Sequence, residues 1–149
     1  MAHVNAMEDF TRNICYHTYR GENGGTILTA EMTDHFHDIK MEVLVDIGSL
    51  AILSARVNFV RHPSENCPDV AGQMERLVGF TIGRGLSRKL RELFGGCEGC
   101  GNLRLMLQGL LPLAINVQAA VGFSDEQQML DSIKRRLTGS CAGYIKCPE

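Results

Sequence analysis

Apolar residues recur at every second position through much of the first half of the chain. The clearest run covers residues 39–47, where charged side chains hold most of the alternate places. A period of two puts alternate side chains on opposite faces of a strand. Similar runs predict strands over 10–20, 26–32 and 51–59, and the glycines of residues 21–25 suit a hairpin turn. The apolar face of the last strand is predicted to consist of Ala51, Leu53, Ala55, Val57 and Phe59. The pattern indicates an antiparallel meander with one dry face.

Helical spacing replaces this alternation after a loop at residues 62–68, which contains two prolines. Apolar residues three and four positions apart predict helices over 70–78 and 86–94. Residues 103–121 are apolar enough for a membrane span, but polar residues interrupt them and Pro112 should kink them. We therefore expect a core helix, buried on most sides, and no membrane span. A capping box of Ser124 and Gln127 is predicted to start the last helix. Its inner face would consist of Met129, Leu130, Ile133 and Leu137.

Strands first and helices after predict an α+β fold, with helices covering one face of a small antiparallel sheet. No repeat or linker divides the chain, and 149 residues suit a single domain with a core of its own. We expect strands over 10–60, helices over 68–138 and a polar tail over 139–149.

Charge and composition exclude some classes of function. The chain has 15 basic and 17 acidic side chains, a balance that argues against bulk electrostatic binding of nucleic acid. Residues 2–10 are polar and mixed, without the apolar stretch of a signal peptide, so we expect a cytoplasmic protein. In a reducing compartment, six cysteines indicate metal binding, redox chemistry or core filling rather than a disulfide framework.

The strongest chemical signal is a pair of cysteines, Cys97 and Cys100, among the glycines of residues 96–101. Two thiols at this spacing can hold one metal ion or close one disulfide. Cys100 directly precedes the long apolar helix, where unpaired N–H groups favour a thiolate, so it is the better nucleophile or ligand. A glycine-rich helix entry with two incidental thiols explains the same residues. Cys141 and Cys147 lack the spacing of a second zinc knuckle and have no clear role.

A second group of candidates precedes the strand at residues 39–47. His37 and Asp38 are possible ligands, and Asp34 lies three residues before His37. A turn-capping aspartate and a half-buried histidine are the explanation that such residues favour where a turn leads into a strand.

Cys67 lies in the proline-containing loop after the last strand. Cys15 is expected in the core or on the sheet surface.

Basic residues cluster around a glycine-containing break at residues 83–85. The cluster consists of Arg76, Arg84, Arg88, Lys89 and Arg91, and we call the part from Arg84 to Arg91 the basic face. A solvated helix surface is one explanation, and a docking patch for an acidic protein partner is the other. No aromatic residues are interleaved to stack bases, which again argues against nucleic acid.

Several of these positions resemble a bacterial family known as domain of unknown function 2889, over residues 12–121. The resemblance rests on Asp34, His37, Asp38, Leu77, Val78, Gly79, Ile82, Gly85, Leu93, Gly99, Cys100 and Leu103. The family commonly has a histidine after its Gly-Cys, and this chain has Asn102 there. The resemblance implies no activity.

The order of candidate ligands is also similar to that of iron–sulfur cluster scaffold proteins of the NifU and IscU type. These proteins have a ligand before a strand, one after the next strand and one at a helix start. Here the matching residues are His37 with Asp38, then Cys67, then Cys100 with Cys97 beside it. The resemblance implies a SufE- or NifU-like fold in which His37, Asp38, Cys67 and Cys100 converge on one pocket at the sheet edge. Such a ligand set suits zinc or an iron–sulfur cluster.

Three hypotheses of function follow. The first is a carrier or scaffold, not a catalyst, that holds zinc or an iron–sulfur cluster through Cys67 and Cys100, with His37, Asp38 and Cys97 as further candidates. The second is a thiol redox or sulfur-relay protein in which Cys100 is the nucleophile and Cys97 resolves the intermediate. The third is an interaction module that docks a protein partner on the basic face.

Overall fold

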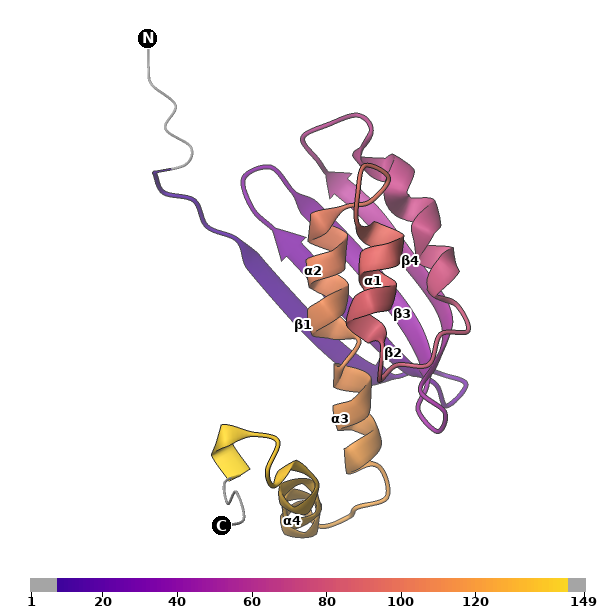
Figure 1. Ribbon diagram of the computed structural model, residues 1–149, viewed down its shortest axis with the longest axis vertical. Coiled ribbons are helices and arrows are strands. Elements are labelled where there is room, and N and C mark those ends of the chain that lie inside the picture. Colours follow the sequence, from indigo (N-terminus) through magenta and orange to yellow (C-terminus); the bar gives the residue numbers. More distant parts are fainter. Residues whose placement is uncertain (1–7, 145–149) are drawn as a thin grey trace. The chain divides into compact units, whose positions relative to one another are not determined.

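The computed structural model describes residues 8–144 of the chain. The chain divides into two compact units, Met1–Ile115 and Asn116–Glu149. The first unit is an antiparallel sheet followed by helices (Figure 1), which confirms the predicted α+β class. That the whole chain acts as a single domain stays a prediction.

The sheet is a four-stranded meander in the order β1-β2-β3-β4, and each neighbouring pair is antiparallel. Its strands are β1 (Asn13–Arg20), β2 (Thr26–Thr33), β3 (Asp38–Asp46) and β4 (Ala51–Arg61). The register pairs Asn13 with Thr33, Thr33 with Asp38, and Asp38 with Arg61. These four residues therefore lie in a row at one end of the sheet, which we call the upper end, as it stands in Figure 1.

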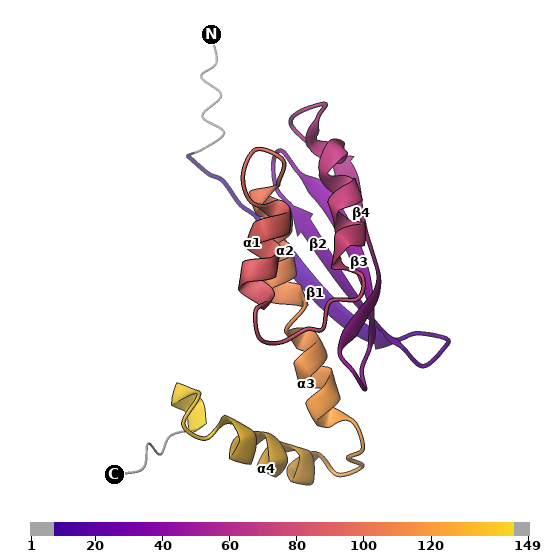
Figure 2. The ribbon, with the colours of Figure 1, turned by 45° about the vertical axis from the view of Figure 1, so that its right-hand side comes forward.

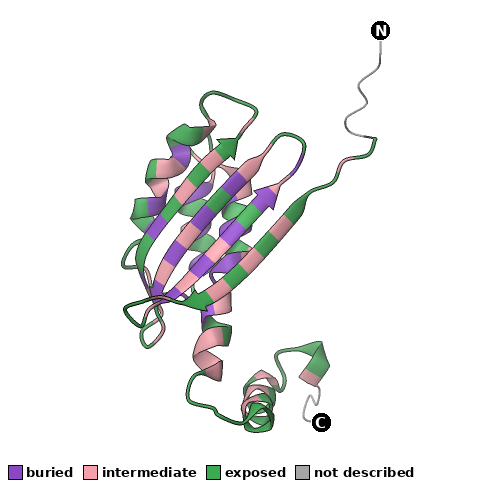
Figure 3. Cartoon of the chain, turned by 180° about the vertical axis from the view of Figure 1, so that it is seen from behind, coloured by how far each residue is buried: buried purple, intermediate pink, exposed green. Residues whose placement is uncertain are grey.

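One face of the sheet packs against helices, and within the described part of the first unit no element covers the other face (Figure 3). The alternation predicted over residues 39–47 is confirmed for β3, where every second side chain is buried. Together with β2, this strand contributes Leu28, Ala30, Met32, Ile39, Met41, Val43 and Val45 to the core.

The predicted face of β4 is wrong at its start. Ile52 is buried there, and Leu53 is 50% exposed. The register explains the difference, because Leu44 pairs with Ser54 while Val45 pairs with Ile52, which leaves Leu53 as an extra residue. A bulge of this kind reverses the alternation on one side of itself. The predicted pattern holds from Ala55 onward.

The helical segments are η1 (Cys67–Leu77), α1 (Leu86–Phe94), α2 (Gly101–Leu110), α3 (Leu113–Ala120), α4 (Glu126–Leu137) and η2 (Ala142–Tyr144). η1 packs along β4, α2 lies over β1 and β2, and α1 lies beside α2 (Figures 1 and 2). η1 is a 3-10 helix that buries Val70, Met74 and Leu77, as the spacing predicts. Val78 was expected in the same stripe but follows the helix and is 50% exposed.

The apolar stretch at residues 103–121 forms two helices, which part next to Pro112 as its missing N–H predicts. α2 buries Leu103, Met106, Leu107 and Leu110, whereas α3 buries only Ala114. A helix buried on most sides is therefore the wrong description of its second half. Within residues 8–144, the segment Gly101–Ala120 alone is long and apolar enough to cross a membrane by length and composition. The absence of a membrane span stays a prediction.

The N-cap of α4 lies one residue later than predicted. The carboxylate of Asp125, not the hydroxyl of Ser124, accepts hydrogen bonds from the N–H groups of Gln127 and Gln128. A carboxylate at this position also complements the helix dipole. No residue of α4 is buried, and Leu130 is 43% exposed, so the predicted inner face is not buried.

Candidate functional site

Every candidate ligand predicted from the sequence lies at the upper end of the sheet. His37 and Asp38 lie where β2 turns into β3, and Cys67 follows the end of β4. Cys97 and Cys100 lie in the loop between α1 and α2. The contact between Asn102 and His37 shows that this loop lies at the same end of the sheet. His37 belongs to a polar network, the three cysteines line a neighbouring pocket, and Asp38 belongs to neither group.

The turn before β3 is built on the carboxylate of Asp34. Its Oδ1 atom accepts hydrogen bonds from the backbone N–H groups of Phe36, at 2.8 Å, and His37, at 2.7 Å. Aspartate commonly closes turns in this way. The Asp34 side chain is fully buried and that of His37 is 14% exposed. The prediction of a turn-capping aspartate and a half-buried histidine is therefore confirmed.

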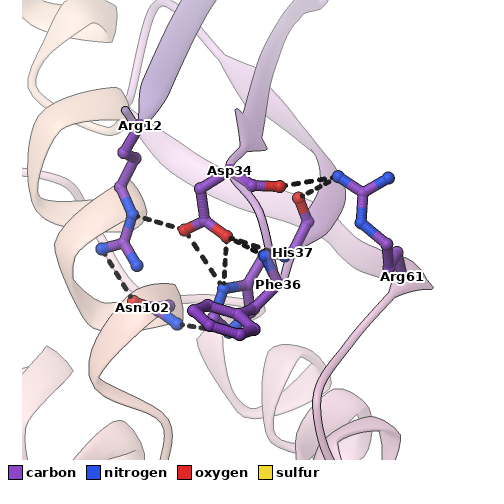
Figure 4. A network of polar contacts seen from close by, with 6 residues as sticks. All are labelled: Arg12, Asp34, Phe36, His37, Arg61 and Asn102. Carbon is purple, nitrogen blue, oxygen red and sulfur yellow. Dashed lines mark hydrogen bonds and ion pairs between the residues drawn. The ribbon is translucent and has the colours of Figure 1, made fainter. Parts of the chain in front are cut away.

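Four side chains close a ring of hydrogen bonds around this turn, which we call the polar ring (Figure 4). Asp34 accepts hydrogen bonds from Arg12 Nε at 2.8 Å and from His37 Nδ1 at 2.9 Å. Arg12 Nη1 donates to Asn102 Oδ1 at 3.2 Å, and Asn102 Nδ2 lies 3.2 Å from His37 Nε2. Since Arg12 fixes the orientation of the Asn102 amide, Nδ2 is the donor and His37 Nε2 the acceptor. Both ring nitrogens of His37 are thereby engaged.

The charge on Asp34 is strongly stabilised. Burial alone raises the pKa of its carboxyl group, but hydrogen bonds from His37, Arg12 and two backbone N–H groups outweigh burial and hold the pKa well below its usual range. Arg61 completes the turn by donating to the carbonyl oxygens of Asp34, at 2.7 Å, and His37, at 3.2 Å (Figure 4). The turn thus holds a buried carboxylate paired with the Arg12 guanidinium group, and its backbone carbonyl groups are bound by that of Arg61.

Cys67, Cys97 and Cys100 line one open pocket of about 430 Å³ between the start of η1 and the α1–α2 loop. We call it the cysteine pocket. All three thiols are free. The carboxylate residues Asp69 and Glu98 also line it. The structure therefore brings together three predicted cysteines from segments that are 30 residues apart in the sequence.

Glycine allows the α1–α2 loop to bring its two cysteines to this pocket. Gly96 has a φ of +70°, in the left-handed region, and ends α1. Gly99 lies so close to the last turn of α1 that a Cβ atom there would collide with the carbonyl group of Phe94. Cys97 is exposed, whereas Cys100 is half-buried against the core and occupies the N-cap position of α2.

The other two predicted ligands lie outside the cysteine pocket. His37 belongs to the polar ring, and Asp38 has a buried Oδ1 atom that makes no hydrogen bond. Within the described residues, no three His, Cys, Asp or Glu side chains are placed to hold one metal ion. The predicted convergence on one pocket thus describes the cysteines and not His37 or Asp38.

Sequence reasoning missed four residues of these two groups. Asp69 and Glu98 lie beside candidate cysteines, and that closeness is a signal that could have flagged them. Arg12 and Asn102 are 90 residues apart, and nothing in a single sequence pairs them.

Two further cysteines are exposed. Cys15 is exposed on β1, in agreement with a place on the sheet surface, and Cys141 is exposed near η2. Cys147 lies outside the described residues.

Comparison with known proteins adds a family. No curated protein and no solved structure matches the chain. The similarity to iron–sulfur scaffolds therefore rests on the order of residues alone, and a NifU-like fold stays a prediction. One family model matches residues 10–116, a span that includes the polar ring and the cysteine pocket. On that match, the chain belongs to the DUF2889 family, which is described as protein of unknown function.

Proposed function

We propose that this protein is a carrier that binds a thiophilic metal ion, zinc or the iron of an iron–sulfur cluster, at the cysteine pocket. The supporting observation is the lining of one open pocket by the three free thiols of Cys67, Cys97 and Cys100. Thiolates select zinc and iron–sulfur clusters over hard cations. A carboxylate from Asp69 or Glu98 would complete a shell of four ligands.

The cysteines are better ligands than His37 because metal binding at their thiols breaks no hydrogen bond, whereas both ring nitrogens of His37 are hydrogen-bonded. A metal ion at Nε2 of His37 would displace the Asn102 amide, and one at Nδ1 would displace the buried carboxylate of Asp34. In the part of the chain from 8 to 144, none of the three thiols makes a hydrogen bond. Metal binding there costs only the proton of each thiol and the closure of the loop.

Loop closure favours a carrier over a permanent structural site. The described residues do not present a preformed metal cage, so at least one thiol must move on binding, and we assign that movement to Cys97 on its glycine-rich loop. A site that assembles on binding spends part of its binding energy on that ordering. It therefore holds its metal less tightly and can release it to an acceptor.

Anaerobic reconstitution tests the proposal. The full chain is treated with zinc, or with ferrous iron and sulfide, and bound metal is measured by elemental analysis and absorbance. We expect stoichiometric metal in the wild type and its loss in the variant Cys67→Ser, Cys100→Ser. The variant Cys15→Ser, Cys141→Ser removes two exposed thiols and serves as the matched control. Equal metal content in both variants would refute the proposal.

A thiol relay is the second candidate, favoured by the position of Cys100 at the start of α2 with Cys97 exposed nearby. In that reaction the Cys100 thiolate attacks a substrate disulfide, forms a mixed disulfide and releases one substrate thiolate. The Cys97 thiolate then attacks Cys100 and releases the second, so a Cys97–Cys100 disulfide forms as the substrate is reduced. Cys67 separates the candidates. Cys67→Ser should abolish metal binding but leave disulfide formation, measured by mass spectrometry after a disulfide challenge, unchanged.

A further inference from the structure

We propose that the groove between α1 and α2 docks an acidic, partly apolar segment of a partner protein. Two adjoining hollows form this groove, and Ser87 and Gln108 line both of them. The Ser87 hydroxyl donates a hydrogen bond to Gln108 Oε1 at 3.0 Å, which bridges the two helices at the junction. We call the whole surface the α1–α2 groove. It includes Arg88 and Arg91 of the basic face on α1 and adds Arg104 from α2.

Three arginines line the groove, and only one of them has an ion-pair partner among the described residues. Arg91 from α1 and Arg104 from α2 line the first hollow, and Arg88 lines the second. Among the described residues, no carboxylate side chain lines either hollow. Within residues 8–144, the side chains of Arg91 and Arg104 make no ion pair or hydrogen bond. Arg88 has only an exposed neighbour on its own helix, Glu92 at 3.5 Å, which a stronger partner can replace.

Apolar surface lies between these charges. Leu105 lines the first hollow and is 51% exposed, although the other leucines of α2 are buried. Pro112 and Ile115 line the second hollow, and Ile115 is 42% exposed. A partner that covers these side chains gains from their removal from water, and carboxylates at its edges meet the guanidinium groups.

This combination fits a peptide better than other anions. A small anion would use the arginines and leave Leu105 and Ile115 uncovered. Single-stranded nucleic acid requires aromatic faces for base stacking, and none of the described residues that line the groove is aromatic. α1 has nine residues and is therefore about 13 Å long, which an extended segment of about four residues spans.

Selection of random peptides displayed on phage, with the full chain as bait, identifies a probe. We expect enrichment of peptides that combine aspartate or glutamate with leucine, isoleucine or phenylalanine. Failure to enrich any peptide, or enrichment of peptides without acidic residues, would overturn the proposal. A labelled version of the best peptide then serves for anisotropy measurements.

Three variants locate the binding surface. Arg91→Glu, Arg104→Glu should weaken binding of the labelled peptide by roughly tenfold or more, since like charges then face each other. The matched control Lys40→Glu, Arg56→Glu changes net charge equally on exposed positions of β3 and β4 in the same unit and should leave binding unchanged. Leu105→Ala should weaken binding without changing its salt dependence. Equal binding by wild type and the α1–α2 variant, or displacement of the peptide by an oligothymidine at lower concentration than by unlabelled peptide, would show that the surface is not an acidic-peptide groove.

Discussion

Replacement of Asp34 by asparagine should destabilise the protein through the polar ring. The substitution keeps the shape of the side chain and the oxygen that accepts the backbone N–H groups of Phe36 and His37. It replaces the oxygen bound to Arg12 by an amide nitrogen, so donor faces donor. The charge that the ring surrounds is lost.

The structure sets the size of the loss. The Asp34 side chain is fully buried and Arg12 is 30% exposed, so solvent screens this pair only in part. Loss of a hydrogen bond to a charged group, with the Arg12 donor left unpaired, costs about 2–4 kcal/mol. With an m-value of about 2 kcal/mol per molar urea, the midpoint of unfolding should fall by about 1–2 M.

The effect should depend on pH with a definite sign. The pKa of Asp34 lies well below its usual range in the folded protein, and an unfolded aspartate has a pKa of about 3.9. A depressed pKa in the folded state stabilises the protein above the unfolded pKa, and this contribution disappears as the pH falls toward the folded value. The difference between wild type and Asp34→Asn should therefore be constant from about pH 8 to pH 5 and shrink below about pH 4.

Urea unfolding followed by far-UV circular dichroism measures these differences at each pH. Asp46→Asn is the control, because Asp46 also closes a turn, through Ser49, but lies exposed on the surface. A loss for Asp34→Asn at pH 7 no larger than that for Asp46→Asn would refute the claim that the buried charge network stabilises the fold. So would a difference that grows as the pH falls.

Three further substitutions test the packing. Gly109→Ala would push a Cβ atom into the ring and hydroxyl of Tyr16 and should cost about 1–3 kcal/mol in urea unfolding, but much less in a Tyr16→Leu background; equal losses in both backgrounds would contradict the contact. Leu103→Ala removes a fully buried side chain and should cost about 2–5 kcal/mol, whereas Leu105→Ala on the exposed face should change stability by less than about 0.5 kcal/mol. Gly99→Ala should displace the α1–α2 loop and lower bound zinc per chain in elemental analysis; unchanged zinc would show that the loop geometry does not matter for binding.

The strands were predictable where alternation is uninterrupted. β3 has a clean period of two, and its apolar set is buried as a block. The prediction for the start of β4 failed because Leu53 is an extra residue. It lies between Ile52, which pairs with Val45, and Ser54, which pairs with Leu44. A bulge changes the phase of a strand without changing its composition, so an isolated sequence gives no sign of it.

The candidate site was predictable where residues are close in sequence and unpredictable where the sheet brings them together. Asp34 and His37 share one turn, and their structural roles follow from the preference of aspartate for turns. Asn102, by contrast, meets His37 across 65 positions of the chain, because α2 begins at the upper end of the sheet, where the turn before β3 lies. That contact occupies Nε2 of His37 with a hydrogen bond. The similarity to iron–sulfur scaffolds assumes that this nitrogen is available to bind a metal.

The first turn of α2 links the three surfaces. Cys100 at its N-cap lines the cysteine pocket, Gly101 lines the α1–α2 groove, and Asn102 closes the polar ring. Since the ring ties Asn102 to the turn before β3, the backbone beside Cys100 is held in place while Cys97 sits on a glycine-rich loop. In the proposed carrier, Cys100 would be the fixed thiol and Cys97 the one that moves. A partner segment in the groove would lie beside the anchored thiol, and this is the arrangement that transfer of a metal ion to a docked acceptor requires.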